Sequence, residues 1–103
     1  ELLCPDGSPL LSLLPFGPKS ISTVAVVSGS GSNELYQALE AGIDLFVTGE
    51  ISHEDYHHAL EGRISVAALG HYRSETVGVR LLSAALGRET GLETLFIDAP
   101  TGL

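Results

Sequence analysis

The stretch that decides the fold is "ISTVAVVSGSGSNELYQALEAGIDLFVTG", residues 21–49. Its first nine residues are β-branched and almost continuously apolar, as expected of a strand buried on both faces. After a glycine-rich turn, Leu35, Ala38 and Leu39 recur at helical spacing. Residues 44–49 are again a short apolar run. The stretch therefore predicts a strand, a helix and a second strand.

Capping residues predict where the helices begin and end. Ser32 or Asn33 is the expected N-cap of the first helix, which Gly42 is placed to end. A second helix is expected between an N-cap at Ser52 and a closing glycine at Gly62. These short polar and glycine-containing segments separate regular elements.

The same alternation continues toward the C-terminus. A third strand is predicted over 64–70, a third helix over 74–91 with Ser74 as N-cap, and a fourth strand over 92–98. In the third helix one apolar stripe is expected to face inward, formed by Val77, Leu81, Ala84 and Ala85. From Ile21 the order is β-α-β-α-β-α-β. This predicts an α/β fold, with a largely parallel or mixed sheet of about four strands and helices packed on it.

Residues 1–20 differ from the rest of the chain because they hold four of its five prolines. Proline lacks an N–H and restricts φ, so turns and short extended pieces are expected there rather than a regular element. The predicted organisation is a Pro-rich segment or linker over 1–20 and an α/β domain over 21–103. The first residue is Glu1 and not Met, which suggests a segment of a larger protein.

Composition excludes several classes of function. The 103 residues carry a net charge of −8, which repels nucleic-acid phosphates and anionic lipid. The single cysteine, Cys4, excludes an internal disulfide and a cysteine-based zinc cluster and fits a cytoplasmic location. No apolar run approaches the roughly 20 residues that span a bilayer. We therefore expect no nucleic-acid partner and no membrane association.

Polar segments follow three of the predicted strands, over 28–32, 48–53 and 71–75. Ligands of open α/β sheets collect outside the carboxyl ends of the strands, so these segments are expected to meet at one edge. "SGSGS" could be a tight strand-to-helix turn or a backbone anion site at a helix start. It matches neither a dinucleotide-binding nor a Walker A pattern.

His71 and Glu75 lie four residues apart in "GHYRSE". Imidazole and carboxylate are suitable ligands for Zn, Mn or Fe, and a carboxylate can bridge two ions. Alternatively, Glu75 only favours the helix N-terminus and His71 packs in a turn. Two ligands do not complete a metal site, so further ligands are expected from elsewhere.

The histidines of "TGEISHEDYHH" form a second candidate group. His53 and His57 have the spacing of an H-E-x-x-H zinc motif, but the chain is too short for the rest of such a protease. His57 and His58 are expected to be solvated. His53 and Glu50 lie nearer the strand end, and they are the candidates for a catalytic general base or substrate contact.

Four segments together resemble one family: "VAVVSGSGS", "AGIDLFVTGEISHED", "GHYRSET" and "LFIDAPTGL". The chain resembles the C-terminal half of the type 2 GTP cyclohydrolase I-like proteins, also called the NGG-one-interacting-factor-three family. The resemblance covers about residue 16 to the end. It implies a dinuclear metal site between two α/β halves, with His71 and Glu75 as metal ligands and Glu75 bridging both ions.

The resemblance also has implications for partners and activity. A His-His pair and an Asp from an N-terminal half would complete the site, and the intact protein would be a homo-oligomer, a hexamer in the family. The implied activity is that of a metal-dependent hydrolase with two divalent ions (Zn, Mn or Fe). The chain alone is expected to bind metal weakly or not at all. Two alternatives remain: a non-catalytic oligomerisation or protein-interaction module, and an anion-binding domain that uses "SGSGS".

Overall fold

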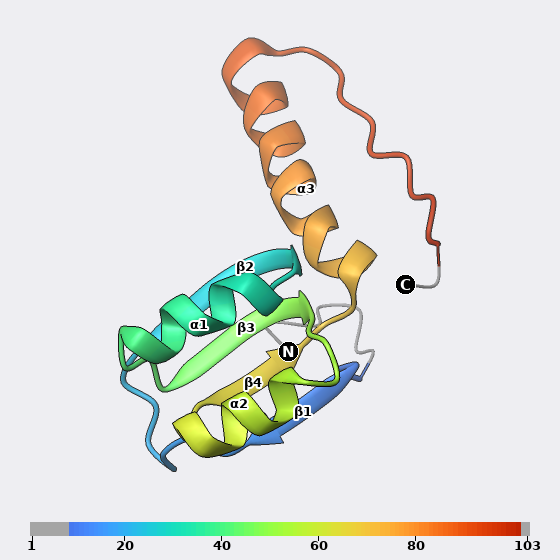
Figure 1. The fold of residues 1–103 in the computed structure, drawn as a ribbon. Helices are drawn as coiled ribbons and strands as arrows, with labels where there is room; N and C mark the ends of the chain where they lie inside the picture. Colours follow the sequence, from blue (N-terminus) through green and yellow to red (C-terminus); the bar gives the residue numbers. More distant parts are fainter. Residues whose placement is uncertain (1–8, 102–103) are drawn as a thin grey trace.

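The computed structural model describes residues 9–101, which form a mixed α/β fold with a four-stranded sheet and three helices (Figure 1). The predicted fold class is confirmed. The elements follow one another as β1 (Ser12–Pro15), β2 (Val24–Ser30), α1 (Ser32–Glu40), β3 (Leu45–Glu50), α2 (Asp55–Gly62), β4 (Ser65–Ala68) and α3 (His71–Thr90).

The sheet has the strand order β1-β4-β3-β2 and is mixed. β2, β3 and β4 run parallel, with Val26 opposite Val47 and Val47 opposite Ala67. β1 pairs antiparallel with β4. Because the three parallel strands point the same way, the segments that follow them emerge at one edge of the sheet.

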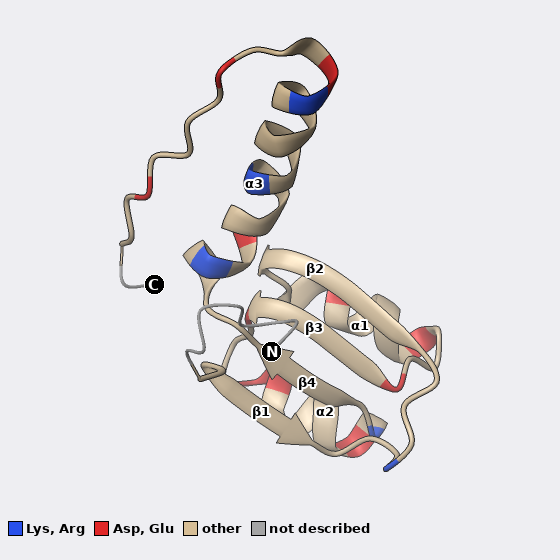
Figure 2. Cartoon of the chain, turned by 180° about the vertical axis from the view of Figure 1, so that it is seen from behind, with Lys and Arg blue, Asp and Glu red and all other residues tan. Residues whose placement is uncertain are grey.

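The main core lies between the sheet and the two short helices, which cover the same face (Figure 1). Its largest fully buried apolar side chains are Phe46, Leu35, Ile64 and Val66. A smaller cluster on the other face consists of Val47, Ala67 and Leu69, with Leu10 and Leu45 partly buried against it. Figure 2 shows this second face, which no helix of the described residues covers in the way that α1 and α2 cover the first.

The prediction that residues 1–20 contain no regular element is wrong at Ser12–Pro15, which forms β1. The same prediction for residues 1–8 falls outside the described part of the chain. Proline is tolerated in this strand because β1 lies at the edge of the sheet, where one side needs no ladder donor. Leu14 and Phe16 pack against the main core. The sheet therefore begins before residue 21.

The prediction of a strand over 92–98 is also wrong. These residues are extended but pair with no strand of the described chain, and they run back beside α3 (Figure 1). The hydroxyl of Tyr72 donates to Asp98 Oδ1 at 2.8 Å and accepts from the N–H of Ala99 at 2.7 Å. The physical reason is that α3 carries the chain away from the sheet, so residues 92–98 do not reach the outer edge of β1 or of β2.

The apolar stripe of α3 does not face inward. Leu81 is 66% exposed and Val77 is 48% exposed. Only the first turn of α3 packs on the sheet, where Ser74 is buried, and the rest projects beyond it (Figure 1). None of the helices in residues 9–101 is both long and apolar enough to cross a bilayer.

The predicted serine and asparagine N-caps are wrong as well. The observed N-cap residues are Gly31, Glu54 and Gly70, and none makes a side-chain capping bond. Ser32 and Ser74 fall inside the first turns of their helices, where their hydroxyls make long-range contacts instead. Local capping preference is overridden here by tertiary hydrogen bonds.

Candidate metal site

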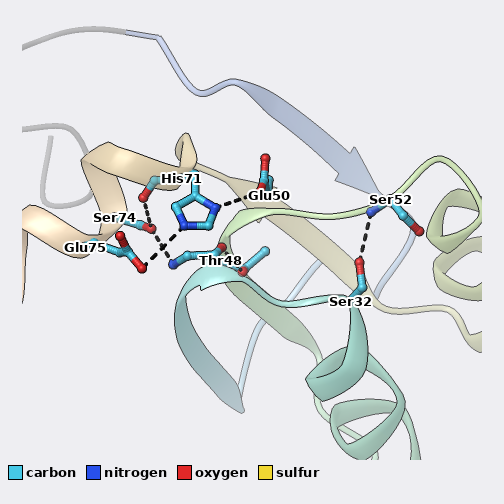
Figure 3. Close-up of polar contacts among 8 residues, drawn as sticks. Ser32, Thr48, Glu50, Ser52, His71, Ser74 and Glu75 are labelled. Carbon is cyan, nitrogen blue, oxygen red and sulfur yellow. Dashed lines mark hydrogen bonds and ion pairs between the residues drawn. The ribbon is translucent and has the colours of Figure 1, made fainter. Parts of the chain in front are cut away.

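The carboxyl ends of β2, β3 and β4 converge as the sequence predicts (Figure 3). The N–H of Gly70 donates to the carbonyl of Gly49 at 2.8 Å, which joins the ends of β4 and β3. Ser74 joins the start of α3 to β2, because its Oγ accepts from the N–H of Gly29 at 2.8 Å and donates to the carbonyl of His71 at 2.8 Å. The first turn of α3 is therefore held against two neighbouring strands.

His71 lies between two carboxylates in this arrangement (Figure 3). Its Nδ1 is 2.7 Å from Glu50 Oε1, and its Nε2 is 3.4 Å from Glu75 Oε1. The hydrogen bond to Glu50 raises the pKa of His71 above its ordinary value. The negative charges of Glu75 and Glu50 also raise this pKa, while partial desolvation opposes them. The imidazole side chain is 37% exposed, so one part of the ring remains accessible.

Two glycines make this close approach possible. A Cβ on Gly29 would lie 2.8 Å from Glu75 Oε1 and 3.4 Å from His71 Nε2, and its φ of +71° is one that other residues rarely adopt. A Cβ on Gly49 would lie 2.5 Å from the Gly29 carbonyl oxygen and from Ser74 Oγ. The space beside His71 and Glu75 therefore depends on the absence of side chains in β2 and β3.

Packing accounts for a glycine in the "SGSGS" turn. At Gly31 a Cβ would overlap the side chain of Thr48. Beside it, the buried carboxylate of Asp55 accepts from Ser32 Oγ at 2.6 Å and from the N–H of Ser52 at 2.7 Å. An anion at the start of α1 would face this carboxylate. The geometry thus favours a tight turn.

The arrangement fits two ligands of a common metal ion. Two atoms bound about 2.1 Å from a tetrahedral ion lie about 3.4 Å apart. This matches the observed separation of His71 Nε2 and Glu75 Oε1. Residues 9–101 contain no cluster of three or more His, Cys, Asp or Glu side chains placed to hold a metal ion. Further ligands would have to come from outside these residues.

His53 does not join this group. It lies exposed before α2, which begins only at Asp55, so it does not share a helical face with His57. His53 and His57 instead border a separate cavity together with Tyr56. Of the two predicted catalytic residues, the structure brings Glu50 into contact with His71, and no hydrogen bond or ion pair described in residues 9–101 connects His53 to it.

Residues 7–102 match the sequence profile of Duf34/NIF3 (NGG1p interacting factor 3). The chain belongs to the Duf34/NIF3 family. It is 52% identical over 91 residues to a GTP cyclohydrolase 1 type 2 homolog of Treponema pallidum (strain Nichols), covering 88% of this chain and 32% of that protein. A protein of the same name from Archaeoglobus fulgidus is 48% identical, with coverage of 88% and 37%.

The fold has solved counterparts among these relatives. The crystal structure of TTHA1606 from Thermus thermophilus superposes with a TM-score of 0.79 at 38% identity, covering 92% of this chain and 44% of that one. This Duf34/NIF3 chain spans about a third of the length of the two curated relatives named above.

Sequence reasoning missed the contact between Glu50 and His71. The two residues are separated by 21 positions in the sequence, so no short motif contains both of them. The available signal was indirect: Glu50 ends one strand, and His71 follows a neighbouring parallel strand. It also missed that Gly29 and Ser74 shape the site, because both contacts cross from β2 to α3.

Proposed function

We propose that this Duf34/NIF3 chain supplies His71 and Glu75 as ligands to a dinuclear metal site in a metal-dependent hydrolase of the GTP cyclohydrolase 1 type 2-like kind. The observation that carries the proposal is the 3.4 Å separation of His71 Nε2 and Glu75 Oε1 beside the space that Gly29 leaves open. The name of the curated relatives agrees with this class of activity.

A bound pair of Zn, Mn or Fe ions would activate a water molecule and polarise the substrate. The chain contributes the groups that bind and orient. Nε2 of His71 offers a lone pair, and the Glu75 carboxylate has two oxygens that can serve two ions. Both side chains project from the first turns of α3, which Ser74 ties to β2.

We propose that the remaining ligands belong to an N-terminal half of the same longer protein. The chain covers 32% and 37% of two curated relatives, which leaves ample polypeptide for such a half. The described residues hold no complete cluster of metal ligands. The 103-residue chain alone is therefore expected to bind divalent metal weakly or not at all.

Metal analysis of the full-length protein tests this function. His71→Ala should abolish stoichiometric metal, measured by inductively coupled plasma mass spectrometry on the purified protein. His57→Ala is the matched control, because His57 is exposed on α2 and borders a different cavity. Unchanged metal content in His71→Ala would contradict the proposal.

A second candidate is a non-catalytic oligomerisation or protein-interaction module. It is favoured by the apolar residues that remain uncovered on α3 and along 92–97, among them Leu81, Leu82, Leu95 and Ile97. We propose that these side chains contact the N-terminal half or another copy in the intact homo-oligomer. Light scattering on the isolated chain distinguishes the interaction module from the metal-binding half. An oligomer of defined size supports the module. A monomer that forms aggregates of no defined size supports a half that lacks its partner.

We also propose that the intact protein works in the cytoplasm. The single cysteine of this chain is consistent with a reducing compartment. Cell fractionation that recovers the protein outside the cytoplasm would contradict this location.

A further inference from the structure

We propose that Glu50 is a positioning residue that fixes the tautomer and the ring orientation of His71, so that Nε2 is the nitrogen free to bind metal. This inference rests on the proposed function for the role of Nε2. The hydrogen bond on which it depends is a feature of the chain itself. It replaces the general-base role considered for Glu50 with an action through His71.

The short contact determines which nitrogen carries the proton. Ionised carboxylates only accept hydrogen bonds, and the 2.7 Å contact of Nδ1 with Glu50 Oε1 is shorter than the 3.4 Å contact of Nε2 with Glu75 Oε1, so a single ring proton belongs on Nδ1. In the neutral imidazole this leaves Nε2 unprotonated, and Nε2 is the atom that faces Glu75. Metal-ligating histidines commonly donate their second ring N–H to a carboxylate in this way.

Both partners of the hydrogen bond are held by the backbone. The carbonyl of Glu50 accepts from the N–H of Gly31 at 3.0 Å, at the point where Ser30 pairs with Glu50. His71 follows Gly70, whose N–H is bonded to the Gly49 carbonyl at 2.8 Å. The carboxylate and the ring therefore start from adjacent, fixed ends of β3 and β4.

The Nε2 side of the ring faces the Glu75 carboxylate and the backbone of Gly29. The missing Cβ of Gly29 leaves Nε2 and the Glu75 carboxylate without a side chain from β2 against them. Glu50 thus engages Nδ1 of His71, while Nε2 faces the second proposed ligand, Glu75. A Glu50 carboxylate already engaged at 2.7 Å is better placed to orient the ring than to take a proton from a substrate.

The tautomer can be measured without any metal. In the 103-residue chain, long-range ¹H–¹⁵N NMR at a pH above which the His71 ring signals no longer change, so that the imidazole is neutral, should show His71 mainly as the Nδ1–H form. Glu50→Ala should shift it toward the Nε2–H form, while Glu50→Gln, whose side-chain oxygen can still accept, should retain part of the Nδ1–H signal. Glu61→Ala, an exposed glutamate of α2, is the control and should change nothing.

The consequence for binding is measured on the full-length protein with Zn²⁺ as the probe. Competition with a chelator should show affinity reduced about 10–100-fold in Glu50→Ala and less in Glu50→Gln. An Nε2–H form in the unmodified chain, or an unchanged tautomer in Glu50→Ala, would overturn the inference. So would unchanged Zn²⁺ affinity in a folded Glu50→Ala protein whose tautomer has shifted. Failure of the proposed function itself is recognised separately, because His71→Ala would then also keep its metal.

Discussion

The two apolar regions of this chain have opposite environments. Between the sheet and α1 and α2, Phe46 is fully buried within a continuous cluster. Along α3 and the extended segment after it, Leu81 and Ile97 are 66% and 77% exposed, although their surroundings in the sequence are equally apolar. The side chains between the sheet and the two short helices bury one another. Among the described residues, no element buries the apolar side chains of α3 and of the segment after it. The comparison indicates that the sheet and short helices are the self-contained part of the chain.

The largest expected effect contrasts the two regions directly. Phe46→Ala should lower the free energy of unfolding by about 3–5 kcal/mol, because it removes a large buried side chain and leaves a cavity. Leu95→Ala, at a position 82% exposed, should change it by less than about 0.5 kcal/mol. Urea unfolding of the 103-residue chain measures both. Similar losses in the two variants would show that the second region is packed as well.

A buried polar contact stabilises the first region. Asp55→Ala should cost about 1–3 kcal/mol, since it removes the acceptor of Ser32 Oγ and one of the two acceptors of the Ser52 N–H, the other being Ser32 Oγ at 3.0 Å. Glu54→Ala is the neighbouring control, because its contact with the Ser52 hydroxyl is exposed and 3.2 Å long. Thermal or urea unfolding that finds equal stabilities for the two variants would argue against the role given to Asp55.

Two glycines with similar positive φ angles, +71° at Gly29 and +67° at Gly42, separate strain from loss of the site. Gly29→Ala and Gly42→Ala should each cost about 1–2 kcal/mol through positive φ. Only at Gly29 would the new Cβ approach Glu75 and His71, whereas nothing lies within 4 Å of the corresponding Cβ at Gly42. Zn²⁺ titration of the full-length variants should therefore show weakened binding for Gly29→Ala alone. Equal affinities would show that the space at Gly29 does not matter.

The smallest effect is expected at the opposite end of β3. Backbone N–H groups of Ser22 and Thr23 donate to the Asp44 carboxylate and lower its pKa, with a further contribution from the Thr23 hydroxyl. A lowered folded-state pKa gives stability that is complete above the ordinary Asp pKa and is lost as pH falls through the folded value. Asp44→Asn should thus be less stable than the unmodified chain at about pH 7, and the difference should shrink as pH falls below the ordinary pKa of Asp.

Urea midpoints at several pH values measure this difference. Glu61→Gln is the control, because it removes a carboxylate of the exposed end of α2 without touching the sheet. A stability difference for Asp44→Asn that is constant with pH would contradict the assignment.

Much of the fold could be predicted because it follows from local patterns. Continuous apolar runs identified β2, β3 and β4, and helical spacing identified the three helices. The errors have a common cause. Residues 92–98 have the composition of a strand, but α3 leads the chain away from the outer edges of β1 and β2 (Figure 1), and β1 already occupies the edge of β4. Ser12–Pro15 has little local signal and pairs because that edge is within its reach.

The candidate site divides in the same way. The sequence placed His71 and Glu75 four residues apart after one strand, and α3, which begins at His71 rather than after Ser74, sets Nε2 and Oε1 of the two side chains 3.4 Å apart. Glu50 could be placed at the end of a strand but not paired with His71, because that contact depends on which strands are neighbours. His53 has the same type of local setting, yet the turn before α2 directs it to a different cavity.

The sequence by itself determined the order of elements, the parallel direction of three strands and the edge where polar residues gather, since these depend on interactions between residues near in the chain. The tertiary structure decided that β1 pairs with β4 at the edge of the sheet, that α3 is exposed, and that the Glu50 carboxylate contacts His71. These depend on contacts between distant segments, where packing and available hydrogen-bond partners outweigh local preference.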